Sequence, residues 1–219
     1  MHILFLLNTF VPIKYLILMN FKTLLIQIVC FFCTLCVWGG HPTYSFHHSW
    51  EVNEGISQLS VVTICQDSRG YLWLGTRNGL NRYNGSGYTI FRHHPGDSLT
   101  IVDNGVNKIC EDHDNNLWIA TIRGVSKMHL PTEHIRNYFI ADGLPDEGIL
   151  SILVDKSGKV WLGSHTGLSC YIPEEDRFRK VEFADNFKGQ VTVLMEDKAG
   201  NMWIGTSSGG VFVCDTKMT

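Results

Sequence analysis

The sequence predicts an all-β protein built of stacked four-stranded sheets, and three observations support this prediction. First, the 219-residue chain contains four copies of a block of fifteen residues with nearly the same pattern. Second, the copies return at intervals of 42 to 45 residues, a spacing typical of repeat proteins in which each repeat is one small unit. Third, short runs of β-branched residues alternate with turn residues, and in no segment are apolar residues spaced as on one face of an α-helix. Four-stranded antiparallel units of this length are the blades of a β-propeller.

Each repeat carries an aspartate six residues before a tryptophan. The four pairs are Asp67 and Trp73, Asp112 and Trp118, Asp155 and Trp161, and Asp197 and Trp203. A binding site is usually made once, whereas a structural demand recurs in every copy, so we expect these residues to be structural. The aspartate would cap a hairpin turn, and the tryptophan would fill the space between neighbouring sheets.

Within one repeat, the residue types predict a meander of four antiparallel strands. In the first copy the predicted strands are Val61–Gln66, Tyr71–Thr76, Leu80–Tyr83 and Tyr88–His93, separated by tight turns rich in Asp, Asn and Gly. In the second copy Asn115 stands where the other copies have glycine. Asparagine is the other residue that tolerates a left-handed backbone, so we expect the turn to survive.

Two further positions are shared between the copies. A hydroxyl residue ends the predicted second strand of every copy, and we expect it to hold the hairpin that follows. These residues are Thr76, Thr121, Ser164 and Thr206. Ile56 and Leu144 each lie 17 residues before a tryptophan, and we expect them to lead into the first strand of a blade.

The repeats divide the chain into a leading segment, residues 1–40, and a propeller, residues 41–219. The predicted blades cover about residues 54–96, 97–141, 142–184 and 185–219. The last copy supplies only three strands, and Tyr44–Trp50 resembles a fourth strand, so we expect this segment to complete the last sheet and remove an exposed edge. A flat β-sandwich is the alternative fold, but it does not require near-identical hairpins at a constant spacing.

The leading segment has the features of an export signal. Thr23–Val37 is an uncharged run that begins after Lys22 and is followed by two glycines. Neither this run nor the earlier apolar run, Ile3–Met19, reaches the roughly 20 residues of a membrane-spanning helix. We therefore expect a signal peptide within residues 1–40, with Met19 as the true start, and an uncleaved signal anchor as the alternative.

Composition argues against several kinds of partner. The net charge is −3 and the basic residues are scattered, which does not favour a nucleic-acid partner. The histidine pairs, such as His93 and His94, would point to opposite faces of a strand, so we expect no metal site and no cofactor. Cys30, Cys33 and Cys36 lie in the apolar leading segment and are interpreted as hydrophobic filler. The remaining cysteines occupy apolar repeat positions, and we expect no disulfide.

A ligand site is expected where the copies differ rather than where they agree. The turn after the second strand changes from copy to copy, and it offers Arg77, Asn78, Arg123 and His165. If these turns converge at one end of the propeller, their guanidinium, amide and imidazole groups would suit a sugar or a carboxylate. The alternative interpretation is that they are ordinary solvated turns.

The repeat resembles that of a known family. Asp67–Tyr83 has the pattern Asp-x-x-Gly-x-Leu-Trp-Leu-Gly-Thr-x-x-Gly-Leu-x-Arg-Tyr, which is similar to the two-component regulator propeller repeat, and Gly55–Ser57 fits the start of that family's first blade. The resemblance covers about residues 44–219. It implies a sensor region of a hybrid histidine kinase, exported to the periplasmic side of the inner membrane, with seven-bladed propellers of which four blades are recognisable here.

The resemblance also implies a ligand and a partner. It implies oligosaccharide ligands, control of carbohydrate-use genes and a homodimer that signals through altered packing of its protomers. Contact with the membrane would come only from the leading segment or from a downstream helix that this sequence does not contain. The expectation is therefore a fragment or a short relic of a longer sensor.

The sequence gives no catalytic set, and we expect this chain not to be an enzyme. It contains no phospho-acceptor histidine motif and no nucleotide-binding box, so no kinase activity can be assigned to its residues. The aspartate lies six rather than five residues before the tryptophan, which is the wrong spacing for a sialidase-type box. Glu174, Glu175 and Asp176 are interpreted as a solvated turn. A protein-binding scaffold and a propeller hydrolase or lyase remain the alternatives.

Overall fold

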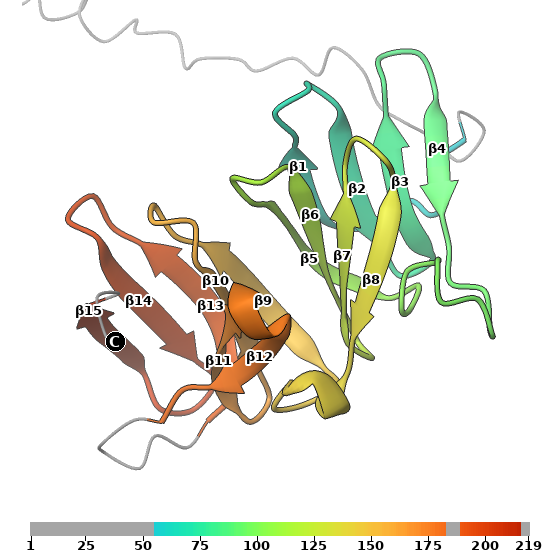
Figure 1. Cartoon of the computed structure of the whole chain (residues 1–219). Helices are drawn as coiled ribbons and strands as arrows, with labels where there is room; N and C mark the ends of the chain where they lie inside the picture. Colours follow the sequence, from blue (N-terminus) through green and yellow to red (C-terminus); the bar gives the residue numbers. More distant parts are fainter. Residues whose placement is uncertain (1–54, 183–188, 216–219) are drawn as a thin grey trace, which may run out of the picture. The chain divides into compact units, whose positions relative to one another are not determined.

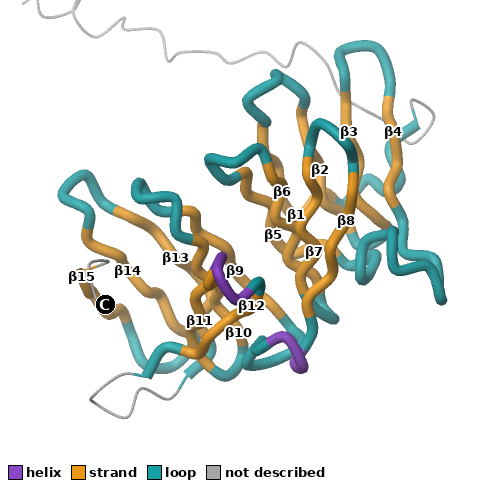
Figure 2. Tube along the Cα trace, in the orientation of Figure 1, coloured by secondary structure: helices purple, strands orange, loops and turns teal. Residues whose placement is uncertain are grey.

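The computed structural model describes residues 55–182 and 189–215. This part of the chain is all-β, with fifteen strands in four antiparallel sheets and two short 3-10 turns, η3 (Ile140–Asp142) and η4 (Pro173–Glu175) (Figures 1 and 2). The predicted signal segment, the start at Met19 and the strand at Tyr44–Trp50 lie outside the described residues.

The first two sheets are meanders whose strands follow one another in chain order. The first blade consists of β1 (Val61–Gln66), β2 (Leu72–Thr76), β3 (Gly79–Tyr83) and β4 (Tyr88–Phe91). The second blade consists of β5 (Val106–Glu111), β6 (Asn116–Thr121), β7 (Val125–His129) and β8 (His134–Tyr138).

The last two sheets repeat the same order. The third blade consists of β9 (Ile149–Val154), β10 (Val160–Ser164), β11 (Gly167–Ile172) and β12 (Arg177–Lys180). The fourth blade, as described, has three strands, β13 (Val191–Glu196), β14 (Asn201–Thr206) and β15 (Val211–Asp215). The four-stranded meander predicted from the sequence is therefore confirmed for the first three copies.

The strand bounds in the first blade agree closely with the prediction, and one difference has a clear cause. The strand β4 ends at Phe91, two residues before the predicted end. It ends there because the backbone N–H of His93 donates to the side-chain oxygen of Asn104, in the loop before β5, at 2.8 Å. The chain is thus drawn away from its own sheet and toward the next one.

The predicted left-handed turns are present. Gly70 has a φ of +91°, and Asn115, its counterpart in the second blade, has a φ of +60°. Asparagine therefore replaces glycine at this turn without changing the hairpin, as expected from its tolerance of this conformation.

Neighbouring sheets pack through their first two strands. β1 contacts β5, β5 contacts β9, and β9 contacts β13. The second strand of each blade also lies against the first strand of the next, so that β2 contacts β5, β6 contacts β9 and β10 contacts β13. First strands that lie side by side, with each sheet covering the next, are the arrangement of propeller blades.

Three apolar clusters fill the spaces between these sheets. Each cluster contains the repeat tryptophan of one blade and the aliphatic residues of the next: Trp73 packs with Val106 and Ile119, and Trp161 packs with Val191 and Ile204. The second tryptophan lies in an aromatic cluster with Tyr138, Tyr171 and Phe178. The expectation that the tryptophan fills the space between sheets is confirmed at these three positions.

The fourth tryptophan differs in its surroundings. Trp203 is 39% exposed, whereas Trp73 and Trp118 are fully buried. Met195, Val211 and Val213, which share its face of the sheet, are also exposed because no described strand covers this face.

We expect Trp118→Ala and Trp203→Ala to differ strongly in cost. Removing a fully packed tryptophan from a core costs about 3 to 5 kcal/mol, because contacts are lost and a cavity remains. The partly exposed Trp203 has fewer contacts to lose, so its replacement should cost less than half as much. Urea unfolding followed by circular dichroism measures both changes, and equal losses would contradict the assignment of Trp118 to a blade interface.

A second pair of variants tests the closeness of the packing. A Cβ on Gly163 would lie 2.3 Å from the Ser151 hydroxyl oxygen and 2.5 Å from a Val191 methyl group, whereas a Cβ on Gly205 would meet Val193 at 3.4 Å. We expect Gly163→Ala to destabilise the protein by about 1 to 3 kcal/mol through overpacking. Gly205→Ala, the matched control, should be close to neutral in the same unfolding measurement.

Candidate functional site

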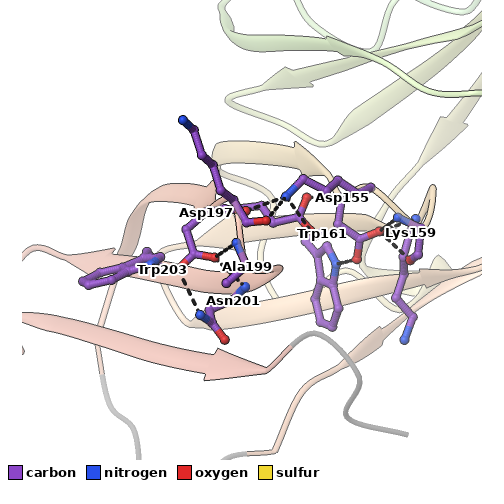
Figure 3. Close-up of polar contacts among 11 residues, drawn as sticks. Asp155, Lys159, Trp161, Asp197, Ala199, Asn201 and Trp203 are labelled. Carbon is purple, nitrogen blue, oxygen red and sulfur yellow. Dashed lines mark hydrogen bonds and ion pairs between the residues drawn. The ribbon is translucent and has the colours of Figure 1, made fainter.

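The repeated aspartate binds the repeated tryptophan in every blade. One carboxylate oxygen accepts the indole N–H, at 2.8 Å for Asp67 and Trp73, 2.7 Å for Asp112 and Trp118, 2.8 Å for Asp155 and Trp161, and 3.1 Å for Asp197 and Trp203. The other oxygen accepts the backbone N–H groups of the residues two and four positions later, as Figure 3 shows for the last two blades. The aspartate therefore caps the turn, as predicted, and also orients the tryptophan.

These hydrogen bonds favour the ionised aspartate. Burial of Asp155 raises its pKa, but hydrogen bonds from Ser157, Trp161 and the backbone of Lys159 together outweigh burial and hold the pKa below its ordinary value. In the fourth blade, hydrogen bonds from Asn201 and Trp203 lower the pKa of Asp197. A carboxylate that is saturated with structural hydrogen bonds is poorly placed to act on a ligand.

The hydroxyl residues at the ends of the second strands hold the hairpins, as predicted. Their hydroxyl groups donate to a glycine carbonyl across the turn and accept a backbone N–H within it. The donor hydroxyls belong to Thr76, Thr121, Ser164 and Thr206, at 2.9 to 3.1 Å from their acceptors. These residues are therefore structural rather than part of a site.

Polar links between blades were not predicted from the sequence. Glu111 accepts from the backbone N–H and the hydroxyl of Ser68 in the preceding blade, both at 2.7 Å, and Glu196 accepts from the backbone N–H of Lys156 at 2.8 Å. Both glutamates lie directly before the repeat aspartate. At the same position the third blade has Val154, which packs against the apolar core instead.

The four predicted site residues lie in the turns after the second strands, beside the loops that precede the first strands. Arg77 donates to Asn107 at 3.1 Å, and the Asn78 amide donates to the backbone carbonyl of residue 57 at 3.2 Å. The Arg123 guanidinium lies 3.8 Å from Asp103, and His165 lies over Gly148. Within the described part of the chain, no recorded contact joins these four side chains to one another.

One of these four residues, Arg123, lines a cleft. An open cleft of about 780 Å³ lies between the loop of residues 93–102 and the edge strand β8. Arg123 contributes to its wall, together with residues that the sequence did not single out, among them Leu99, Phe139 and Glu147. Leu99, Arg123 and Phe139 lie in three separate segments of the second copy and Glu147 lies in the third copy, so only the folded structure brings them together.

A cluster of tyrosines and one carboxylate joins the second and third blades. The hydroxyls of Tyr138 and Tyr171 both donate to Asp176, and Arg136 lies 3.4 Å from its other oxygen. Burial raises the pKa of Tyr171 to about 12, and hydrogen bonds from both tyrosines hold the pKa of Asp176 below its ordinary value although burial opposes this. Asp176 is 55% exposed at the end of η4, in agreement with the predicted solvated turn, and the hydrogen bond that it accepts from Tyr138 of the neighbouring blade was not predicted.

The cysteines and the possible metal ligands of the described residues form neither a reactive thiol nor a metal site. Cys65, Cys110 and Cys170 are free thiols, and burial raises the pKa of Cys65 and of Cys170 to about 11, which keeps these two thiols protonated. In residues 55–182 and 189–215, no group of histidine, cysteine, aspartate and glutamate side chains has the geometry of a metal site. Across the same described ranges, no helix is long and apolar enough to cross a membrane.

Fold and repeat together define the class of protein. The chain is a β-propeller protein in which an aspartate–tryptophan hydrogen bond recurs in each blade. The profile of the two-component regulator propeller family matches residues 55–78, 100–123, 143–166 and 187–208. The chain therefore belongs to the two-component regulator propeller family, as its repeat pattern predicted.

This chain is similar in sequence to a histidine kinase. The chain is 34% identical to histidine kinase P4 of Formosa agariphila over 76% of its own length. It spans only 16% of the length of that kinase.

Solved structures support the fold. The extracellular domain of a hybrid two-component system of B. thetaiotaomicron superposes with a TM-score of 0.69 at 22% identity, covering 77% of this chain and 25% of that one. An inactive virginiamycin B lyase of Staphylococcus aureus superposes with a TM-score of 0.53 at 15% identity, covering 72% of this chain and 56% of the lyase. At these identities both similarities concern the fold alone.

We expect Asp155→Asn to lower stability in a pH-dependent way. The folded pKa of Asp155 lies below its ordinary value of 3.8. The charge therefore stabilises the fold above about pH 4, and this contribution is lost as the pH falls through the folded pKa. The variant should lose about 1 to 3 kcal/mol at pH 7 and less than that near pH 3.

Urea unfolding between pH 7 and pH 3 measures this difference. The matched control is Asp114→Asn, a change in the exposed part of the equivalent turn of the second blade. It should alter stability little at either pH. A constant difference between Asp155→Asn and the unmodified protein at all pH values would contradict the role of the charge.

Proposed function

We propose that this chain is the ligand-sensing propeller of a hybrid two-component sensor histidine kinase, located outside the cytoplasm on the periplasmic side of the inner membrane. In this proposal it responds to oligosaccharides and controls the transcription of carbohydrate-use genes. The observation that carries the proposal is the 34% identity with a histidine kinase over most of this chain. The shared fold with an extracellular domain of a hybrid two-component system also supports it.

The kinase step is assigned to no residue of this chain. Because the chain spans 16% of the similar kinase, phosphoryl transfer would belong to parts of such a protein that this chain does not match. The described polar clusters have structural roles. The aspartates cap turns and orient tryptophans, and the buried thiols and tyrosines have raised pKa values that keep them protonated.

A sensor of this kind works only if its ligand binds one conformation of the protein more tightly than another. A ligand shifts an equilibrium by no more than its difference in affinity for the two conformations. We propose that an oligosaccharide binds at the end of the blades that carries Arg77, Asn78, Arg123 and His165, and that it changes the packing between two protomers.

Isothermal titration calorimetry of the purified protein with a panel of neutral, uronate and sulfated oligosaccharides tests this proposal. We expect at least one class to bind, and the combined variant Arg77→Ala, Arg123→Ala and His165→Ala to bind about tenfold or more weakly, since charged hydrogen bonds each contribute about 1.5 to 3 kcal/mol. Arg177→Ala, at an exposed arginine of β12, is the control and should bind normally.

Two outcomes would count against the proposal. Failure of every oligosaccharide to bind would overturn oligosaccharide sensing by this chain. Binding that the combined variant leaves unchanged would place the site away from these turns.

A further inference from the structure

The cleft beside β8 has the size and setting of a ligand site. Its volume, about 780 Å³, falls within the range of roughly 300 to 1,000 Å³ that is usual for small-molecule pockets. One wall is the loop that leaves β4 and enters the second blade, and the other is β8, the edge strand of that blade (Figure 1). The cleft therefore lies beside the connection between the first and second blades.

The two walls are fixed to each other by hydrogen bonds. The Asn137 amide, on β8, donates to the backbone carbonyls of residues 98 and 100, at 3.3 and 2.8 Å. Its oxygen accepts from the hydroxyl of Ser126, which in turn accepts the backbone N–H of Val102 at 2.9 Å. Since both walls are already held in place, a ligand would not have to order them, and this reduces the entropic cost of binding.

The cleft exposes apolar side chains from both walls. Leu99, on the loop, is 62% exposed, and Phe139, directly after β8, is 46% exposed. An aromatic ring with one free face offers a rigid apolar surface at a small cost in conformational entropy. The C–H face of a pyranose ring is the kind of surface that packs against such a ring.

Polar groups of both signs surround these apolar residues. Arg123 is 71% exposed, and its one ion pair, with Asp103, is long at 3.8 Å. The carboxylates of Asp97 and Glu147 are exposed on the lining, and one oxygen of Asp97 accepts only the backbone N–H of Leu99. Each sugar hydroxyl both donates and accepts, so a polyhydroxylated ligand is suited by a wall that offers donors and acceptors together.

The balance of charge argues for an uncharged ligand. The second arginine of the lining, Arg136, is already paired with Asp142 at 2.8 Å and with Asp176 at 3.4 Å. The lining then holds Arg123 with the carboxylates of Asp97 and Glu147, and it has no excess of positive charge when His93 and His134 are neutral. An acidic or sulfated sugar would gain no net attraction and would meet two carboxylates.

We propose that the cleft between residues 93–102 and β8 binds a short neutral oligosaccharide, with Phe139 packed on a sugar ring and with Arg123, Asp97 and Glu147 bound to its hydroxyls. This inference rests on the proposed function, because it names the site and the class of sugar for the sensing step. It goes beyond the four turn residues, since of these only Arg123 belongs to the cleft.

Calorimetric titration of the full chain with neutral, uronate and sulfated oligosaccharides tests the proposal through single variants. Phe139→Ala and Glu147→Gln should each weaken binding of a neutral oligosaccharide by about tenfold or more. The matched controls are Ile140→Ala, which removes the exposed apolar neighbour of Phe139 from outside the cleft, and Glu174→Gln. Both controls should bind as the unmodified protein does, and circular dichroism should show that all four variants are folded.

The outcomes separate this inference from the proposed function. Neutral sugars that bind normally to Phe139→Ala and Glu147→Gln would overturn the cleft as the site and leave oligosaccharide sensing intact. Binding confined to uronate or sulfated sugars would overturn the neutral class, even if it were lost in the same variants. A protein that binds no oligosaccharide at all would overturn the proposed function and this inference with it.

Discussion

The hydrogen bond between the repeat aspartate and the indole of the repeat tryptophan is the interaction on which the rest of the structure depends. One carboxylate closes the turn between the first two strands of a blade with one oxygen and fixes the tryptophan with the other, as in Asp155 and Trp161. The turn and the surface that meets the next blade are therefore set by the same residue. Loss of that charge would affect both the hairpin and the interface between sheets.

The stacking of blades follows from this arrangement. A tryptophan held in a single orientation presents a flat apolar surface, and the next blade covers it with aliphatic residues such as Val106 and Val191. Small residues such as Gly163 allow the sheets to approach closely, and Glu111 and Glu196 add polar links at the edge of the interface. The partial exposure of Trp203 shows how much of the burial of the other tryptophans comes from the following blade.

In the function that we propose, the ligand site lies in the parts of the blades that do not repeat. The repeated residues are occupied by structural hydrogen bonds, and the exposed charges gather in the loops and at the edge strands. The loop after β4 and the strand β8 form an open cleft, and its walls are joined through Asn137 and Ser126. A ligand bound there would contact none of the repeated Asp–Trp pairs.

The sequence by itself determined the repeat, the four-stranded meander and the structural role of Asp67, Trp73 and their counterparts. Spacing and turn chemistry are local properties, and each copy confirms the others. Only the tertiary structure decided which side chains meet across blades. Asp176 meets Tyr138 of the preceding blade, and Arg123 and Phe139 of the second copy share a cleft with Glu147 of the third copy, because consecutive sheets pack face to face. The sequence alone does not predict these contacts, because they depend on the twist and spacing of whole blades.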